Sequence, residues 1–225
     1  MPAPICVLIP TLNVSAHLPD CLSALVEGLS AGLIHELIVS DGGSEDATQA
    51  ICEEAGARIV TGPPSRGGQL RRGAAVARGD WLLVIHADSV LDPGWSDAVA
   101  DHLGQGGTAC FRLRFRARGL MPRWVAGWAN LRTRTLGLPY GDQGLLVSRR
   151  DYDAAGGYPD QPLMEDVALV RALPGRVDLL PVAITTDAGR YERDGWLRRG
   201  ARNLAILTRY LLGADPERLD RAYRR

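Results

Sequence analysis

Short apolar runs alternate with segments of helical periodicity through residues 1–103, and this alternation is the feature that most limits the possible folds. Between the first two runs, apolar residues recur from Leu18 to Leu29 at the spacing of a helix that packs one face on a sheet. Strands separated by helices are typical of βαβ units and a mostly parallel sheet. We therefore expect an α/β fold whose first strands are Ile5–Ile9, Glu36–Ser40, Arg58–Thr61 and Trp81–Ile85.

The pattern changes after Leu103. Apolar and charged residues alternate through Ala109–Phe115, which is the period of a half-exposed strand. We therefore expect a mixed sheet that is mostly parallel in its N-terminal half and is flanked by helices. The further elements predicted are the helices Trp124–Thr135, Glu165–Leu173 and Leu197–Leu212 and the strands Gly144–Ser148 and Val177–Leu180.

The composition is that of a globular protein, with 46% hydrophobic and 23% charged residues and a formal net charge of zero. A neutral chain is not expected to bind nucleic acid. No segment approaches the ~20 apolar residues that span a bilayer, and the N-terminus lacks the basic start of a signal peptide. Four scattered cysteines without a CxxC pair are typical of free thiols. We expect a cytoplasmic protein that contacts membranes at most peripherally.

Polar residues follow three of the expected parallel strands. They are Thr11 and Asn13 after the first strand, Asp41 after the second and Asp88 after the fourth. Because the carboxyl ends of parallel strands meet at one edge, we expect these side chains to line one cleft. Asp88 is the first candidate for chemistry, with a hard metal ion as its partner. The alternative is that such residues only cap helices, as Asp92 before Pro93 is expected to do.

Two glycine-rich segments exclude familiar nucleotide-binding loops. Asp41-Gly42-Gly43-Ser44 is not GxGxxG, and Gly67–Gly73 lacks the Lys-Ser/Thr ending of a phosphate-binding loop. A Rossmann dehydrogenase and a P-loop enzyme are therefore disfavoured. The pair Gly67-Gly68 still permits close approach of a backbone, and neighbouring arginines suit a diphosphate or form a solvated helix face. These arginines are Arg66, Arg71 and Arg72.

The order of these motifs resembles family 2 glycosyltransferases of the GT-A fold, which have a Rossmann-type mixed sheet. The motifs that carry the resemblance are Pro10-Thr11-Leu12-Asn13, Ser40-Asp41-Gly42-Gly43-Ser44 with Asp46, the Arg71 region, His86-Ala87-Asp88, Gly141-Asp142-Gln143-Gly144, Ser148-Arg149-Arg150, Gly156-Gly157-Tyr158 and Met164-Glu165-Asp166. The resemblance implies a nucleotide-diphospho-sugar donor, a divalent cation and an inverting transfer to an acceptor hydroxyl. The alternatives are a non-catalytic nucleotide-sugar-binding protein and a nucleotidyltransferase.

The resemblance also implies how the chain is organised. No repeat, low-complexity tract or flexible linker marks a boundary, so we expect one GT-A-like domain over residues 1–225. Residues 1–103 would form the nucleotide-binding half and residues 104–185 the acceptor and catalytic half. Residues 186–225 would form an Arg-rich helical extension.

Carried over to this sequence, the family motifs assign nucleotide and metal contacts. Asp88 matches the last carboxylate of an Asp-x-Asp motif that holds Mn²⁺ or Mg²⁺ on the diphosphate. His86 replaces the first carboxylate, and it either ligates the metal, which suits Mn²⁺ better than Mg²⁺, or only lines the cleft. The residues expected to bind the nucleotide are Pro10, Thr11, Asn13, Asp41, Arg66, Arg71 and Asp88.

A second set of motifs is assigned to the acceptor side. Glu165 and Asp166 open a predicted helix, and the resemblance makes Asp166 the base that takes the acceptor proton. Glu165 would orient a neighbouring arginine or the acceptor. The alternative is the ordinary placement of acids at a helix N-terminus. A second motif either binds the acceptor or sugar or forms only a turn, and it comprises Gly141, Asp142 and Gln143.

The C-terminal segment has arginines interspersed with apolar residues through Leu197–Leu212. Such a helix either packs on its own domain with a solvated basic face or lies on an anionic membrane, where it would hold a lipid-linked acceptor. We favour packing. Asp187 precedes this segment where relatives often have a histidine near the metal, and it is not included among the expected ligands.

Overall fold

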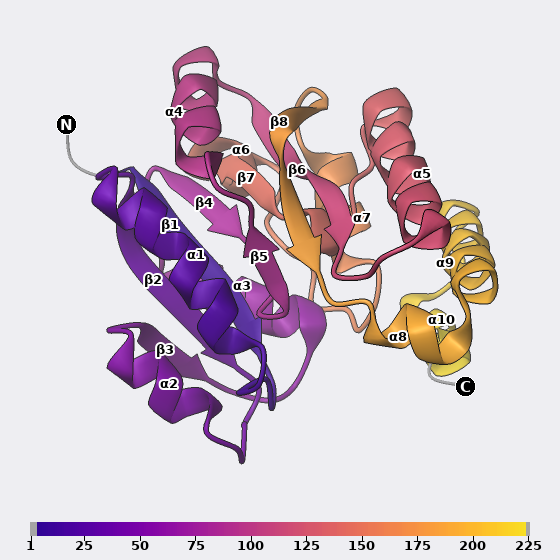
Figure 1. The fold of residues 1–225 in the computed structure, drawn as a ribbon, viewed down its shortest axis with the longest axis horizontal. Helices are drawn as coiled ribbons and strands as arrows, with labels where there is room; N and C mark the ends of the chain where they lie inside the picture. Colours follow the sequence, from indigo (N-terminus) through magenta and orange to yellow (C-terminus); the bar gives the residue numbers. More distant parts are fainter. Residues whose placement is uncertain (1–3, 224–225) are drawn as a thin grey trace.

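The computed structural model describes residues 4–223, and within them eight strands form one sheet with helices on both faces (Figure 1). The strand order is β3-β2-β1-β4-β7-β6-β8-β5. The strands are β1 Ile5–Thr11, β2 Ile34–Asp41, β3 Arg58–Thr61, β4 Trp81–Val84, β5 Ser89–Leu91, β6 Thr108–Phe115, β7 Leu145–Ser148 and β8 Val177–Thr186.

The helices fill the connections between the strands. They are α1 Leu18–Ser30, α2 Thr48–Glu54, α3 Arg66–Val76, α4 Trp95–Gln105, α5 Leu120–Leu136, α6 Arg149–Ala154, α7 Glu165–Ala172, α8 Gly189–Asp194, α9 Trp196–Leu211 and α10 Pro216–Tyr223, with a 3-10 turn η1 at Gly141–Gln143. The short helices α6, α8 and α10 and the strand β5 were not predicted, because runs this short carry too few residues to show a period.

The N-terminal half is the expected parallel sheet. β1 pairs in parallel with both β2 and β4, and β2 pairs in parallel with β3. Alternate residues of β1 point to opposite faces, so Val7 packs with the core under α1 and α4 while Leu8 packs with α3. Both residues are fully buried, which explains why this strand is an unbroken apolar run.

The C-terminal half is mixed, as predicted. β7 lies antiparallel to β4 and β6, whereas β6 and β8 are parallel. β8 extends to Thr186, beyond the predicted Val177–Leu180, because it pairs with β6 on one side and with β5 on the other. Partners on both sides satisfy the backbone groups of a segment whose sequence alone does not show strand alternation.

The prediction that Asp92 caps the next helix is wrong. The chain after Asp88 continues as β5, and the Asp92 carboxylate accepts hydrogen bonds from Arg114 at 2.6 Å and from the Thr185 hydroxyl at 2.9 Å. Helix α4 begins after Gly94 instead, and the distant carboxylate of Glu27 accepts hydrogen bonds from the Gly94 N–H at 3.1 Å and the Ser96 N–H at 2.9 Å. A cap from another helix leaves no mark in the local sequence.

The C-terminal helices pack on the sheet domain, as favoured from the sequence. Ile206 and Leu207 of α9 are buried in a cluster with Val167 of α7 and Leu219 of α10. The four cysteines are buried and free, which confirms their apolar settings. In the described part of the chain, no helix is both long and apolar enough to cross a membrane.

Candidate active site

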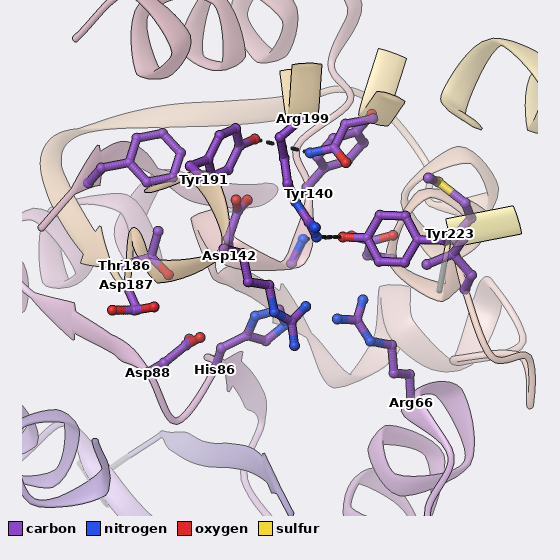
Figure 2. Close-up of a pocket in the computed structure, with 17 residues that line it drawn as sticks. Arg66, His86, Asp88, Tyr140, Asp142, Thr186, Asp187, Tyr191, Arg199 and Tyr223 are labelled. Atoms are coloured by element: carbon purple, nitrogen blue, oxygen red, sulfur yellow. Dashed lines mark hydrogen bonds between the residues drawn. The ribbon is translucent and has the colours of Figure 1, made fainter. Parts of the chain in front are cut away.

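A cavity of about 170 Å³ opens where the β4–β5 turn, η1, the start of α7 and the C-terminal helices meet (Figure 2). Six residues of the sequence-predicted site line it together: Arg66, His86, Asp88, Gly141, Asp142 and Asp166. An adjoining pocket shares the first three of these and adds Pro10, Thr11 and Glu165. Residues separated by more than 150 positions in the sequence therefore line these adjoining pockets.

Strand pairing brings Asp88 beside Asp187. β5 runs antiparallel to β8 with Ser89 opposite Thr186, and Asp88 and Asp187 are the next residues outward on the two strands. The Ser89 hydroxyl lies 3.3 Å from Asp88 Oδ1 and 3.1 Å from the Oγ1 atom of Thr186, the residue before Asp187. The Gly189 N–H donates to Asp187 Oδ2 at 2.8 Å. Figure 2 shows both carboxylates pointing into the same part of the cavity.

His86 lines the same cavity as these two carboxylates. A Cβ atom added to Gly141 would lie 2.7 Å from His86 Nε2, so the ring edge packs against the η1 backbone. Burial lowers the pKa of His86, and the Asp88 carboxylate acts in the opposite direction. The ring is therefore favoured in its neutral form.

Asp166, at the start of α7, is held in place by one backbone N–H group of η1 and one of α7. Its Oδ2 accepts from the Gly141 N–H at 2.6 Å, and its Oδ1 accepts from the Val167 N–H at 2.7 Å. Met164, with a φ of 63°, turns the chain so that α7 begins at this point. A carboxylate has about four lone-pair sites, so two remain for a substrate proton.

Glu165 points away from water. Its side chain is 3% exposed, and in the part of the chain that the structure describes Oε2 has no hydrogen-bond partner. Burial raises the pKa of Glu165 to about 7, with a further rise from the Asp166 carboxylate and an opposing effect of the Arg66 guanidinium. Two adjacent acids thus occupy different environments, as expected where one of them is kept protonated.

Asp142 faces the cavity from η1 (Figure 2). Burial raises its pKa to about 6; Arg132 lowers it, while Asp166 raises it further. Arg132 is fixed by stacking 3.6 Å over the centre of the Tyr140 ring. The neighbouring Gln143 is fully buried, and its amide bonds to Thr133 at 2.8 Å and to the Phe111 carbonyl at 3.2 Å. A sugar contact of Gln143 stays a prediction.

Three arginines line the same cavity as the carboxylates. Arg66 begins α3 and Arg199 projects from α9 (Figure 2), and Arg190 lies on α8. Arg199 is buried and donates to Asp194 at 2.7 Å and to the Tyr223 hydroxyl. The sequence indicated Arg190 and Arg199 only as members of a basic segment. It gave no signal for the other polar lining residues, Tyr140, Tyr191, Asn203 and Tyr223.

Asp41 ties the ends of β1 and β2 together beside this cleft. Its carboxylate is fully buried and accepts hydrogen bonds from Thr11 at 2.7 Å, from the Ser44 hydroxyl at 2.6 Å and N–H at 2.8 Å, and from Gln49 at 2.9 Å. Burial alone would raise the pKa of Asp41, but these hydrogen bonds lower it to about 2. The Asn13 side chain accepts from the Glu45 N–H at 2.9 Å. Nucleotide contacts of Asp41 and Asn13 stay predictions.

The glycines at the start of α3 pack against another segment of the same chain. A Cβ on Gly67 would lie 2.0 Å from the Pro159 carbonyl oxygen, and the Gly67 N–H donates to the Gln161 carbonyl at 3.1 Å. The space beside Gly67, which the sequence predicted for a diphosphate, is therefore occupied by the loop before α7. Arg71 lies on the exposed side of α3, and its contact with a nucleotide also stays a prediction.

The donor set suits a metal that arrives with a diphosphate. In residues 4–223, no three Asp, Glu, His or Cys side chains are grouped closely enough to hold an ion by themselves. Mg²⁺ and Mn²⁺ at nucleotide sites are held by one or two carboxylates plus substrate phosphates. Asp88 and Asp187 supply such a pair of carboxylates.

Comparison with known proteins identifies the family. Residues 6–147 match the model of a family described as Glycosyl transferase family 2. The chain belongs to this family. The match covers more than half of the chain, and it confirms the resemblance carried by the ordered motifs.

Named relatives of this family 2 chain are glycosyltransferases. A PGL/p-HBAD biosynthesis glycosyltransferase of Mycobacterium bovis is 36% identical over 92 residues, which are 38% of this chain and 35% of that protein. Glycosyltransferase AglJ of Haloferax volcanii is 30% identical over 110 residues, 47% of this chain and 35% of that protein. The chain thus spans about a third of the length of these relatives.

Solved structures confirm the GT-A-like fold. Glucosyl-3-phosphoglycerate synthase from Mycobacterium tuberculosis, in complex with Mn²⁺, UDP and phosphoglyceric acid, superposes with a TM-score of 0.52 and 22% identity over 82% of this chain and 69% of that one. S. aureus TarS 1-349, in complex with UDP-GlcNAc, gives a TM-score of 0.55 and 13% identity over 82% of this chain and 58% of that one.

Proposed function

We propose that the protein transfers a sugar from a nucleotide-diphospho-sugar to an acceptor hydroxyl with inversion at the anomeric carbon. The observation that carries the proposal is the arrangement of one cavity. Carboxylates suited to a metal-bound diphosphate, Asp88 and Asp187, and a backbone-held carboxylate, Asp166, all line it, together with three arginines. Family membership, the TarS structure with UDP-GlcNAc and the synthase structure with UDP support the donor class.

The residues that line the cavity have different roles in the reaction. Asp166 accepts the proton of the acceptor hydroxyl as that oxygen attacks the anomeric carbon. The bond from that carbon to the diphosphate oxygen breaks, and the diphosphate leaves with the electron pair. Arg66 and Arg190 stabilise the negative charge that accumulates on it. Inversion follows because attack and departure occur on opposite faces of the sugar.

Asp88 and Asp187, together with the diphosphate, would hold a divalent cation, Mn²⁺ or Mg²⁺, which would supply further charge neutralisation of the leaving group. His86 lines the cavity in neutral form, and its packing against Gly141 orients the η1 backbone that holds Asp166. Asp142 is placed to hydrogen-bond sugar or acceptor hydroxyls.

The proposal is tested by separating binding from turnover. Wild-type protein is screened by thermal shift against nucleoside diphosphates and nucleotide-sugars with and without Mn²⁺, because a ligand of the native state raises its stability. Nucleoside diphosphate release is then measured with the donor that binds. We expect Asp166→Asn to bind the donor normally but to release diphosphate about 10²–10⁴-fold more slowly, as for loss of a general base.

Two variants complete this test. Asp88→Asn should weaken Mn²⁺-dependent nucleoside diphosphate binding by about tenfold or more, since one of two anionic ligands is lost. Asp101→Asn, an exposed residue of α4, is the control and should behave as wild type. Unchanged release by Asp166→Asn would remove the base assignment. Donor binding without any sugar release would instead support a non-catalytic nucleotide-sugar-binding protein.

A further inference from the structure

Helix α5 exposes an apolar stripe to solvent. Leu120, Trp124, Trp128 and Leu131 recur at intervals of four, four and three residues, and their side chains are 81%, 60%, 50% and 49% exposed. Residues at this spacing lie on one helix face. The opposite face of α5 packs on β6 and β8 through small side chains, so the tryptophans are on its outer side. Two exposed tryptophans on one helix are unusual for a monomeric surface.

Helix α9, which contacts α5, also exposes apolar side chains. Leu197, Leu204 and Leu211 recur every seven residues and are 62%, 46% and 41% exposed, whereas Ile206 and Leu207 face inward. α5 and α9 contact each other and lie side by side in Figure 1. We call the exposed side chains Leu120, Trp124, Trp128, Leu131, Leu197, Leu204 and Leu211 the two-helix face.

The charged side chains of the same two helices are all positive. The whole chain has a formal net charge of zero, yet α5 and α9 contain seven arginines and no Asp or Glu. Four of these arginines are exposed: Arg123, Arg134, Arg198 and Arg209. Their positive charge therefore borders the two-helix face and is not neutralised by an acid of either helix.

We propose that the two-helix face docks the protein on an anionic lipid bilayer. Tryptophan rings favour the interface between water and lipid tails, where their apolar body is buried and the indole N–H stays hydrated. Arginines beside them gain attraction to anionic headgroups. A second copy of this chain would bring like-charged arginines together, so charge complementarity favours lipid over self-association.

Docking would place the cavity next to the membrane, since α9 also sends Arg199 and Asn203 into it. The interaction itself does not depend on the proposed transfer reaction. Its test therefore needs no donor or acceptor, and a failure of one proposal is distinguishable from a failure of the other.

Vesicle sedimentation provides the test. We expect the full chain to bind vesicles of equal parts phosphatidylglycerol and phosphatidylcholine, to bind pure phosphatidylcholine far less, and to dissociate as salt is raised. Trp124→Ser/Trp128→Ser should weaken binding about tenfold or more through lost apolar contact. Arg198→Gln/Arg209→Gln should weaken it about fivefold for each charge removed.

Control variants separate membrane binding from folding. Trp124→Phe/Trp128→Phe should still bind but lose the blue shift of tryptophan emission that vesicles cause in the wild type. Val26→Ser/Leu29→Ser removes two exposed apolar side chains from α1 and should bind normally. Equal binding by wild type and Trp124→Ser/Trp128→Ser would overturn the proposal. So would a wild-type dimer that ignores vesicles and becomes a monomer in this variant, because the face would then join two copies.

Discussion

At the scale of single residues, neighbouring carboxylates of the cavity differ in how the fold holds them. Asp166 accepts hydrogen bonds from two backbone N–H groups, whereas Glu165 is buried and leaves Oε2 without a partner among the described residues. The sequence shows two adjacent acids at a helix start and cannot rank them, because burial and hydrogen bonding are set by distant segments. The raised pKa of Glu165 makes the stability of the protein depend on pH.

We expect the free energy of unfolding to fall as pH rises from about 4.5 towards 7. The native pKa of Glu165 lies near 7, above its ordinary value of 4.5, so in this range the native state binds a proton that the unfolded chain has released. Glu165→Gln should therefore be more stable than wild type at pH 8, by roughly 1–3 kcal/mol, and about equal to it at pH 4. Urea unfolding at several pH values measures both.

The control for this prediction is Glu53→Gln, which changes an exposed carboxylate on α2 and should leave the pH profile of stability as in wild type. A wild-type profile unchanged by Glu165→Gln would show that this carboxylate is not held protonated by the fold.

At the scale of elements, the start of α3 is fixed by its contact with the loop before α7. Gly67 has no room for a side chain, since a Cβ atom there would lie 2.0 Å from the Pro159 oxygen and 2.8 Å from the Gln161 nitrogen. Ser65 caps the helix by accepting from the Gly68 N–H at 3.2 Å. This junction places Arg66 opposite Glu165 and Asp166, so packing between elements positions the arginine of the cavity.

Gly67→Ala should destabilise the protein by roughly 1–3 kcal/mol, the usual cost of overpacking against backbone that cannot move aside. Gly104→Ala is the matched control, because that α4 glycine has nothing within 4 Å of an added Cβ. It should raise stability by about 0.5–1 kcal/mol through better helix propensity. Chemical denaturation of both variants measures these changes in stability. A Gly67→Ala protein as stable as wild type would contradict the packing argument.

At the scale of the whole molecule, the cavity exists because β8 lies between β6 and the short edge strand β5. Antiparallel pairing of Ser89 with Thr186 sets Asp88 beside Asp187, and α8 to α10 then close the cavity with arginine and tyrosine side chains. The two carboxylates come from opposite halves of the chain, so their joint action is a property of the tertiary structure.

A double-mutant cycle should show this joint action. If Asp88 and Asp187 hold one ion, Asp187→Asn should weaken Mn²⁺-dependent nucleoside diphosphate binding about as much as Asp88→Asn does, and the double variant should lose clearly less than the two losses combined. Isothermal titration with Mn²⁺ and a nucleoside diphosphate measures all four proteins. Strictly additive losses would mean that the two carboxylates act at separate places.

Local sequence patterns were enough to predict the α/β class, the parallel N-terminal strands and the convergence of Thr11 and Asp88 on one cleft, because apolar periodicity and strand-end position are local properties. Only the tertiary structure decided that Asp187, Arg190 and Arg199 complete the cavity, that Glu27 in place of Asp92 caps α4, and that the tryptophans of α5 face solvent. Each of these depends on contacts between segments far apart in the chain, and no local pattern encodes such contacts.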